Sequence, residues 1–372
     1  MVKPVFLFGT LRDPQLLDLV AGEPVVQEPA VLHGWRIAGV DQAVYPVLVR
    51  SDGDQAQGAV IRVSQKALDR LVHYEDAFGY DIEEVEVVTD AGPEQALVFQ
   101  PIEGGPAPHG DWALSEWQAS SGARSRFAAQ ELMSYMGRFS GGALQFRRAQ
   151  AEARAHSRVE ATQMPRPRVG TDIPASEVQV KSQQADHAGY FVTETIQLRH
   201  PTFQGGLSEE ITREVFVAAE AVILLPYDPV RDRILLVEQF RMGPWRRGAT
   251  YPWMLEPVAG RVDPGETPES TARREAVEEA GLTLRGLERI GSGYPTPGYS
   301  TEYFHVFLGL CDLPDGIEGH HGEAEEHEDI RTHVLDWAQA EDLLSRGEAD
   351  NMPLVLALVW LSRERSRLRA TA

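Results

Sequence analysis

The sequence predicts two domains of different design, an α+β domain followed by an α/β domain. The chain has 372 residues, whereas a single hydrophobic core rarely grows beyond about 250–300 residues. The stretch 156–179 contains three prolines and shows neither the helical nor the strand period, as expected of a linker. Because no internal repeat relates the two sides, we expect one domain over 1–155 and a different one over 180–372.

The composition is that of a soluble protein and excludes two classes of partner. Hydrophobic residues make up 42% of the chain, and a net charge of −21 lacks the basic footprint that nucleic acids and anionic membrane surfaces require. The single cysteine, Cys311, excludes an intrachain disulfide and fits a reducing cytoplasm. The N-terminal apolar stretch is too short for a signal peptide, and the longest apolar run, 354–361, is too short to cross a bilayer. We expect a cytoplasmic protein.

The C-terminal half contains several strand patterns and ends in helices. Apolar runs at 220–228, 234–241 and 302–310 predict β-strands. Beyond residue 336, a capped helix, a break at Asn351-Met352-Pro353 and an amphipathic helix are expected.

One loop and helix in this half carry an unusual charge pattern. In the segment GRVDPGETPESTARREAVEEAGL, residues 260–282, Thr267 can cap the helix, Pro268 suits its first position and Gly281 suits its end. Glu275, Glu278 and Glu279 follow at i, i+3 and i+4, where like charges destabilise a helix by a few tenths of a kcal/mol per pair. We expect the helix alanines to face a sheet and these glutamates to be exposed beside them. Mg²⁺ prefers carboxylate and phosphate oxygens, so a divalent cation would turn their repulsion into attraction.

The spacing of this segment resembles the Nudix box over its full length. The matching positions are Gly260, Glu266, Arg274, Glu275, Ala276, Glu278, Glu279, Gly281 and Leu282. A solvated acidic helix face, the usual origin of such a run, does not require these intervals. The resemblance implies a C-terminal Nudix α/β/α sandwich and Mg²⁺-dependent hydrolysis of a nucleoside diphosphate linked to another group, with Mn²⁺ as the alternative metal. It also implies that Glu275, Glu279 and the carbonyl of Ala259 bind metal, that Glu278 is a catalytic or further metal-binding group, and that Arg274 is structural.

Over about 180–365 the chain is similar to bacterial ADP-ribose pyrophosphatases. The matching segments include ITREVF, EQFR and LEPVAG. The resemblance implies that Arg213 and Arg241 bind the diphosphate and terminal ribose, that AMP and ribose 5-phosphate are the products, and that the Nudix domain forms a homodimer. The planar fork of arginine suits phosphate oxygens, although a surface arginine is the simpler explanation of either residue alone. Two alternatives stay open: another nucleoside-diphosphate sugar such as GDP-mannose, or a nucleotide-sensing binding protein.

The segment GHHGEAEEHEDIR, residues 319–331, has three interpretations. It could be a disordered acidic excursion or a histidine-rich site for a transition metal. The resemblance implies instead a loop that carries a catalytic base, with Glu326 as that base and Glu328 as a further Mg²⁺ ligand.

The N-terminal half opens with an apolar strand that ends at Gly9-Thr10, where backbone N–H groups are available to an anion. A helix is expected after Ser64, ending near Glu75, and a helical region over 129–155 precedes the linker. These features resemble the gamma-glutamylcyclotransferase-like (AIG2-like) family, which implies a mixed β-barrel with helices.

The family signature is a tyrosine, glycine, serine or threonine and leucine turn together with one glutamate. Gly9, Thr10 and Leu11 supply the turn and substrate-binding positions, Glu75 supplies the catalytic carboxyl, and Phe8 stands where tyrosine is frequent. Two interpretations stay open for this half, active cyclotransferase chemistry or a binding module. Bacterial chains of this two-part design are often labelled tellurite-resistance proteins, a label that defines no reaction.

Overall fold

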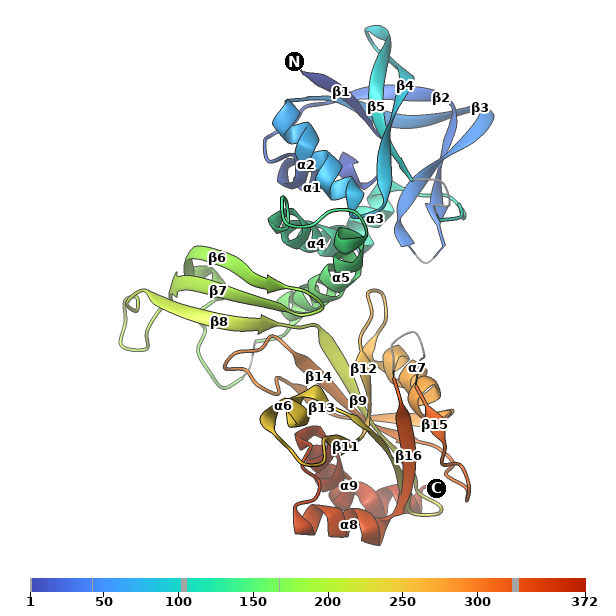
Figure 1. The fold of residues 1–372 in the computed structure, drawn as a ribbon, viewed down its shortest axis with the longest axis vertical. Coiled ribbons are helices and arrows are strands. Elements are labelled where there is room, and N and C mark those ends of the chain that lie inside the picture. The colour runs from blue at the N-terminus through green and yellow to red at the C-terminus, as the bar shows by residue number, and fades with distance from the viewer. Residues whose placement is uncertain (1, 42, 102–105, 167, 323–327) are drawn as a thin grey trace. The chain divides into compact units, whose positions relative to one another are not determined.

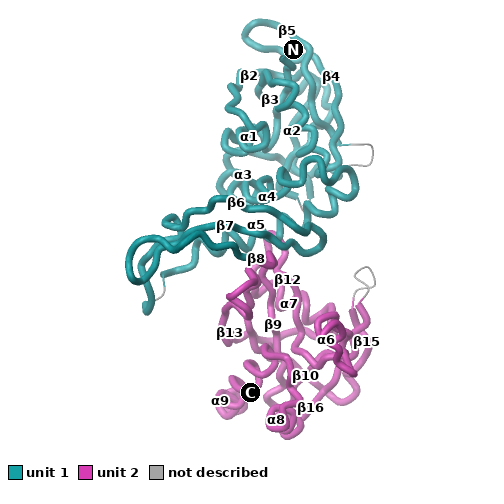
Figure 2. Tube along the Cα trace, turned by 60° about the vertical axis from the view of Figure 1, so that its left-hand side comes forward, with its two compact units in different colours: residues 1–213 teal, residues 214–372 magenta. Residues whose placement is uncertain are grey.

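The computed structural model describes residues 2–41, 43–101, 106–166, 168–322 and 328–372. Contacts between residues divide the chain into two compact units, Met1–Arg213 and Glu214–Ala372 (Figure 2). The two units are described separately below.

The first unit contains a closed five-stranded barrel, which confirms the predicted mixed β-barrel. Its strands are β1 (Lys3–Leu7), β2 (Gln27–Val40), β3 (Ala43–Val63), β4 (Tyr80–Thr89) and β5 (Gly92–Pro101). They follow the order β1-β3-β2-β4-β5, and the barrel closes by a parallel contact between Val5 and Leu97. The interior is filled by alternate residues such as Phe6, Val60 and Val98, as the two-residue period of a strand requires.

Helices cover the barrel and extend the first unit beyond it (Figure 1). They are η1 (Thr10–Arg12), α1 (Pro14–Ala21), α2 (Gln65–Asp76), α3 (Leu114–Ser120), α4 (Gly122–Ser134) and α5 (Gly142–Gln163). Ser64 caps α2 as expected, because its side chain accepts a hydrogen bond from the N–H of Ala67. Asp13 caps α1 and also accepts hydrogen bonds from Gln118 and Arg126, so its buried carboxylate ties α3 and α4 to the barrel.

The region expected to be a linker is partly regular. Helix α5 continues to Gln163, so residues 156–163 are helical and the expected linker start at 156 is too early. The physical reason is that no proline occurs before Pro165, and alanine-rich sequence sustains a helix up to that point. A 3₁₀ turn, η2 (Ala175–Glu177), then leads into a three-stranded sheet of β6 (Gln179–Ala188), β7 (Val192–Arg199) and β8 (Ile211–Val217).

The second unit is built on an eight-stranded sheet. Its strands are β9 (Glu220–Asp228), β10 (Arg233–Phe240), β11 (Trp253–Glu256), β12 (Val258–Arg261), β13 (Gly286–Gly293), β14 (Tyr303–Leu310), β15 (His320–His321) and β16 (Ile330–Asp336). Six of them follow the order β13-β14-β9-β10-β16-β15, while β11 pairs with β10 and β12 with β9. The three strands expected from the sequence correspond to β9, β10 and β14.

Helices lie on both faces of this sheet, which confirms the α/β/α sandwich (Figure 1). They are α6 (Met242–Arg247), α7 (Pro268–Ala280), α8 (Trp337–Arg346) and α9 (Met352–Ala370). On β9, Val222 and Leu224 pack toward the core that contains α7, whereas Leu225 and Tyr227 pack toward the core that contains α8 and α9. Both faces of β9 are therefore buried, as its continuous apolar sequence indicates.

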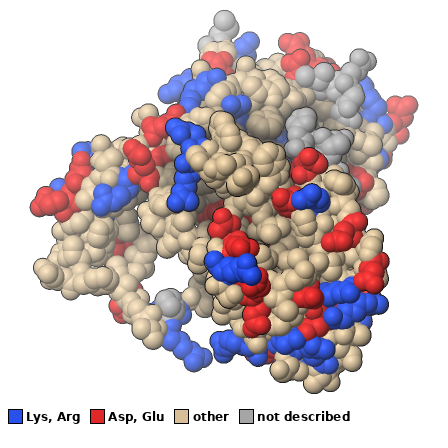
Figure 3. All heavy atoms as spheres, turned by 60° about the horizontal axis from the view of Figure 1, so that its bottom comes forward, with Lys and Arg blue, Asp and Glu red and all other residues tan. Residues whose placement is uncertain are grey.

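Charged side chains are interspersed on the face of the molecule shown in Figure 3, where Lys and Arg lie among Asp and Glu. The pairing is direct on α9, where Arg365 and Arg369 both bind Asp232 and Arg367 binds Glu288. Within the described ranges, no helix combines the length and the apolar character that a membrane crossing needs.

Candidate active sites

The acidic helix α7 begins and ends where its sequence indicates. The side chain of Thr267 accepts a hydrogen bond from the N–H of Ser270, whose hydroxyl in turn accepts one from the N–H of Thr267. Pro268 occupies the first helical position, and Gly281 has the left-handed φ of 62° that ends many helices. These caps place the glutamates of α7 at one fixed position against β12.

Two of the three stacked glutamates are buried, so the expectation that all would be exposed is wrong. Glu275 retains 8% of its accessible surface and Glu279 retains 2%. Gly260 on β12 explains how they fit, since a Cβ atom at that position would lie 1.8 Å from Oε1 of Glu275. The neighbouring Ala259 donates its N–H to Oε2 of Glu279 at 3.0 Å. The backbone of β12 thus approaches the helix closely enough to enclose both carboxyl groups.

Arg274 binds four groups around this pair. Its Nε and Nη2 atoms donate to the two carboxylate oxygens of Glu266, each at 2.9 Å. Its Nη1 atom donates to Glu275 and to Glu278, each at 2.7 Å, and Nη2 also reaches the carbonyl of Arg261 at 3.2 Å. This arrangement lowers the pKa of Glu266, chiefly through the hydrogen bonds of Arg274. The guanidinium therefore holds the acids of the loop and the helix in one geometry.

Burial makes the paired carboxyls unusual acids. Burial raises the pKa of Glu275 to about 7, although the charge and hydrogen bond of Arg274 oppose the shift. Burial likewise raises the pKa of Glu279 to about 8, against the hydrogen bond from Ala259. The charge of Glu328 adds to both shifts, which shows that this residue lies within electrostatic range of the pair. The site therefore brings together three of the acids that the sequence predicts.

The donor set fits a divalent cation. Among the described residues, no three or more His, Cys, Asp or Glu side chains form an arrangement that could hold a metal ion alone. Mg²⁺ does not require one, because it keeps several waters and takes further oxygens from a phosphate substrate. Two buried carboxyls with raised pKa values are stabilised when a cation replaces their protons.

The predicted arginines differ in what they contact. Arg241 donates from Nε to Glu256 Oε2 at 2.6 Å, and its charge lowers the pKa of Glu279, so it lies near the acidic pair. Glu256 also accepts a hydrogen bond from Asn351 at 2.8 Å. Arg213 is the last residue of the first unit, and its guanidinium donates to the carbonyl of Thr212. Glu326, the base expected from the sequence, lies outside the described residues.

Glu256 is a site residue that the sequence analysis did not single out. Its location in LEPVAG, directly before the box, was the available signal.

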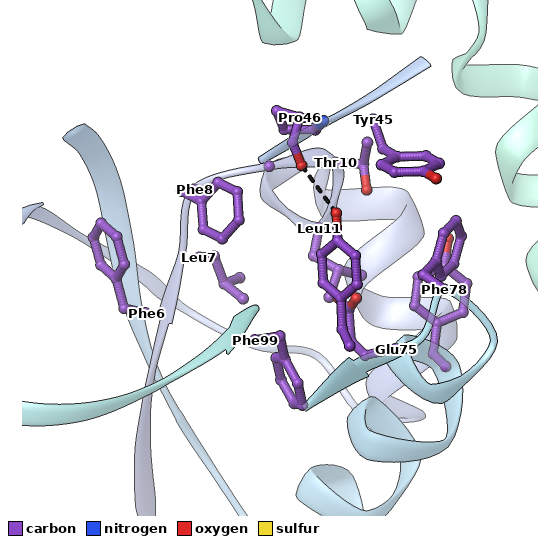
Figure 4. A pocket seen from close by; sticks show the side chains of 13 residues that line it. Phe6, Leu7, Phe8, Thr10, Leu11, Tyr45, Pro46, Glu75, Phe78 and Phe99 are labelled. Atoms are coloured by element: carbon purple, nitrogen blue, oxygen red, sulfur yellow. Dashed lines mark hydrogen bonds between the residues drawn. The ribbon is translucent and has the colours of Figure 1, made fainter. Parts of the chain in front are cut away.

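A second site lies in the barrel of the first unit, where one cavity joins the predicted turn to the predicted glutamate (Figure 4). It encloses about 460 Å³, including its opening to solvent, and is lined by Phe6, Leu7, Phe8, Gly9, Thr10, Leu11, Tyr45, Pro46, Tyr74, Glu75, Phe78, Tyr80 and Phe99. Thr10 and Leu11 begin the 3₁₀ turn η1, so their N–H groups have no acceptor inside that turn. Gly9 permits the turn to press against Pro46, whose Cγ would lie 3.0 Å from an added Cβ.

Glu75 is the only carboxyl group that lines this cavity among the described residues. Burial raises the pKa of Glu75 to about 8, and no hydrogen bond or ion pair to another described side chain offsets that shift. Phe8 is buried in the barrel wall and places no hydroxyl there, as the sequence indicates. The tyrosines Tyr45, Tyr74 and Tyr80 were not predicted, although the aromatic sequence around Glu75 was a usable signal. A carboxyl with a pKa near neutrality can donate a proton in its neutral form and accept one in its charged form.

Comparisons with known families match both units. The NUDIX domain model matches residues 218–358, and the model described as gamma-glutamyl cyclotransferase, AIG2-like, matches residues 5–114. The first match contains the whole of α7 and the second contains the barrel with Glu75.

Named relatives resemble about half of the chain. The ADP-ribose pyrophosphatase of Escherichia coli is 38% identical over 194 residues, which are 52% of this chain and 92% of the relative. That of Haemophilus influenzae is 37% identical over 195 residues, covering 52% and 89%. The GDP-mannose pyrophosphatase of Escherichia coli is 31% identical over 149 residues, covering 40% and 76%.

Three findings agree with one another. They are the box helix with its two buried acids, the matching domain model, and the relatives that are covered over most of their length. The chain therefore belongs to the Nudix family, as a Nudix pyrophosphohydrolase that carries an AIG2-like gamma-glutamyl cyclotransferase domain at its N-terminus.

Proposed function

We propose that the Nudix domain hydrolyses the diphosphate of ADP-ribose to AMP and ribose 5-phosphate with Mg²⁺, or with Mn²⁺ as the alternative metal. The observation that carries this proposal is the pair of buried carboxyls, Glu275 and Glu279, with the guanidinium of Arg241 in electrostatic range. Such a group of opposite charges suits a diphosphate bound with a cation. The relatives named ADP-ribose pyrophosphatase support this choice of substrate.

Four groups would hold the metal: the carboxylates of Glu275, Glu279 and Glu328 and the carbonyl of Ala259. When bound, Mg²⁺ would neutralise charge on the diphosphate and acidify a water molecule. Ala259 anchors Glu279 through its N–H, so ligand geometry is set by the backbone of β12. Arg274 keeps Glu275 and Glu278 in place from the other side.

The remaining residues bind the diphosphate and move the proton. Arg241 is held by Glu256 and would pair with phosphate oxygens, and Arg213 would bind the terminal ribose and its phosphate. Water attacks one phosphorus, the bridging oxygen leaves with its electron pair, and Glu326 accepts the proton of the water. Glu278 acts as a catalytic group beside the metal-binding pair.

The proposed substrate is tested by the products released with Mg²⁺. AMP should form from ADP-ribose faster than GMP forms from GDP-mannose, at equal concentrations of each substrate. GDP-mannose is the alternative substrate because one relative is a GDP-mannose pyrophosphatase. Faster release of GMP than of AMP would favour this alternative. Binding of both nucleotides without turnover would favour a sensor.

We also propose that residues 180–213 belong to the Nudix domain, so that this domain comprises residues 180–372 as the sequence predicts. The 194 residues matched by the Escherichia coli relative are more than Glu214–Ala372 contains. The similarity must therefore include part of the chain before Glu214. A fragment starting at residue 180 should hydrolyse the diphosphate at the rate of the full chain, whereas one starting at 214 should be less active.

A homodimer through the Nudix domain is the proposed assembly. Large apolar side chains are exposed around α6, and these are Phe240, Met242, Trp245, Tyr251 and Trp253. The rings of Phe240 and Trp253 contact each other with centroids 5.6 Å apart, and apolar side chains exposed together mark protein–protein interaction sites. Sedimentation of the full chain should show twice the monomer mass, and Trp245→Glu should reduce it to the monomer.

For the barrel we propose cyclotransferase chemistry, because Glu75 is an unpaired carboxyl in a cavity beside the Gly9-Thr10 turn. The α-amine of a γ-glutamyl amide attacks the γ-carbonyl carbon, a ring C–N bond forms, and the bond to the leaving amine breaks. Glu75 takes a proton from the attacking amine and returns it to the leaving amine. Release of 5-oxoproline that is lost in Glu75→Gln tests this, and no release from any γ-glutamyl dipeptide would favour a binding module.

A further inference from the structure

A second cavity lies beside the barrel cavity and shares part of its wall. It encloses about 420 Å³, including its opening to solvent. The shared residues are Thr10, Tyr45, Tyr74 and Phe78. A ligand that passed between these shared side chains would span both cavities, from the carboxyl of Glu75 to the second cavity.

The far wall of the second cavity comes from helices outside the matched cyclotransferase residues. That match ends at residue 114. Trp117 lies on α3, Arg124 and Ser125 lie on α4, and Glu152 lies on α5. The helical extension therefore adds to the barrel a group of polar and charged side chains that the barrel alone lacks.

Several hydrogen-bond donors at this wall have no acceptor. Trp117 is 3% exposed, and its indole N–H, which can only donate, has no partner in the part of the chain that the structure describes. Arg148 lines neither cavity but binds Glu152, which lines the second one, and its buried Nε atom has no partner among the described residues. Burial lowers the pKa of Arg124, the charge of Glu152 opposes this shift, and no described residue accepts a hydrogen bond from the Arg124 guanidinium. Buried donors normally have a hydrogen-bond acceptor, so we expect a bound ligand to supply the acceptor for these donors.

The charges around the two cavities are also unbalanced. Arg148 binds Glu152 at 2.8 Å and its guanidinium lies 5.0 Å from the ring centre of Phe78, on the shared wall. Arg124 adds a second positive charge, and Glu152 is the one carboxylate that lines this cavity among the described residues. Because Arg148 neutralises Glu152, the charge of Arg124 is left without a carboxylate bound to it, and in a chain with a net charge of −21 such a positive group attracts an anion.

The contacts indicate which anion fits. The guanidinium of Arg124 and the indole N–H of Trp117 both line the cavity and suit the two oxygens of a carboxylate. The aromatic residues between the cavities suit an apolar segment, and the N–H groups of the Gly9-Thr10 turn with Glu75 suit a carbonyl or an amide.

We propose that the second cavity is a carboxylate-binding subsite, built by Arg124 and Trp117 while Arg148 neutralises Glu152, for a small amide whose leaving side carries an apolar group and a free carboxylate. The place of the amide beside Glu75 rests on the proposed cyclotransferase function, whereas the carboxylate subsite does not.

The test compares two ligands that differ in one charge, γ-glutamyl-phenylalanine and the same compound with its C-terminal carboxylate converted to a carboxamide. Calorimetry with the full chain measures binding, and 5-oxoproline release measures turnover. The free acid should bind at least tenfold more tightly than the carboxamide, as a charge-assisted contact implies. Arg124→Gln should remove most of this preference and leave carboxamide binding within about twofold of wild type.

Three further variants give matched controls. Arg158→Gln removes an exposed arginine of α5 that contacts Phe127, away from both cavities, and should keep the full preference. Arg124→Lys retains the charge without the fork and should restore part of it. Trp117→Phe retains the ring without the N–H and should lower acid binding several-fold, which keeps the test decisive if Arg124→Gln does not fold.

The outcomes separate this proposal from the barrel chemistry. Equal binding of acid and carboxamide by the wild-type protein overturns the subsite, even if Glu75→Gln abolishes turnover. An acid preference that persists in both Arg124→Gln and Trp117→Phe also overturns it. A preference lost in those variants supports the subsite even when no 5-oxoproline forms, and in that case only the cyclotransferase function fails.

Discussion

The two units surround their buried carboxyl groups with different side chains. In the barrel, Glu75 stands alone among aromatic side chains, and its pKa rises to about 8. In the Nudix domain, Glu275 and Glu279 are more deeply buried, with pKa values of about 7 and 8, but hydrogen bonds from Arg274 and Ala259 hold their carboxylate oxygens. Burial therefore raises the pKa at both sites, while only one site supplies groups that favour the charged form.

This difference indicates what each site is built to receive. A lone carboxyl in an apolar cavity is most stable with a proton, which suits a group that exchanges protons with a substrate. Carboxyls that are buried in pairs and already held by a guanidinium and a backbone N–H are arranged for a cation to replace their protons. The four predictions below test this contrast between a proton site and a cation site.

The largest effect is expected from Glu279→Gln. The amide keeps the shape and the hydrogen bond from Ala259 but cannot carry the negative charge, so diphosphate hydrolysis should fall on the order of 10³-fold. Product release with Mg²⁺ measures this. Glu269→Gln, at an exposed position in the first turn of the same helix, should leave the rate unchanged. Near-normal activity of Glu279→Gln would contradict the cation site.

Gly260→Ala tests whether close approach of β12 sets the geometry of the acids. The added Cβ would lie 1.8 Å from Glu275 Oε1, and the carboxyl is held by Arg274, so the helix or the strand must shift. A misplacement of this kind should reduce kcat by about 10²-fold. Gly291→Ala adds a Cβ to open space in β13 and serves as the control, with activity expected to stay at the wild-type level. Equal activity of both variants would show that the close approach is not required.

The barrel should show the opposite dependence on charge. The pKa of Glu75 is about 8 in the folded protein against 4.5 as the ordinary value, so the folded state retains a proton that the unfolded state loses. The folding stability that this proton contributes is present below about pH 4.5 and is lost as the pH rises toward 8. Between pH 5 and pH 8 the Glu75→Gln variant should therefore lose about 2 kcal/mol less folding stability than the wild type. The partial exposure of the carboxyl keeps this difference below that of a fully buried group. Denaturant unfolding at pH 5 and pH 8 measures it, and equal pH dependence of both proteins would argue against a buried proton.

The smallest effect is a shift of the unfolding temperature with Mg²⁺. A pH of 8 lies above the pKa of Glu275, about 7, and at the pKa of Glu279, about 8, so these carboxyls are largely charged. Saturating Mg²⁺ should then raise Tm by a few degrees. At pH 6 both pKa values exceed the pH, protons compete with the metal, and the shift should be smaller. Calorimetric scans with and without Mg²⁺ measure both shifts. A larger shift at pH 6 would contradict competition between metal and protons at these carboxyls.

Much of the architecture is readable from local sequence. Thr267, Pro268 and Gly281 bound α7, and Ser64 caps α2, because capping depends on a few adjacent residues. The apolar runs of β9, β10 and β14 are likewise local signals. Helix α5 ends at Gln163 and not at the expected 155, because the mixed composition of 156–179 indicates a linker although its first proline is Pro165.

The sites were readable only in part. The glutamates of the box were located by their spacing, but their burial depends on Gly260 of another strand, which no helical pattern reveals. Glu256 became visible only through its contact with Arg241. The second barrel cavity was missed, since Trp117, Arg124 and Glu152 come from three helices whose sequences carry no motif.

The amino-acid sequence alone determined which chemistry this protein carries, because motif residues at fixed intervals specify acids, glycines and caps without reference to the rest of the chain. Only the tertiary structure decided how those acids behave. A pKa, an unsatisfied indole N–H and a cavity wall all depend on which distant residues exclude water from a group, and that is settled when strands and helices pack together.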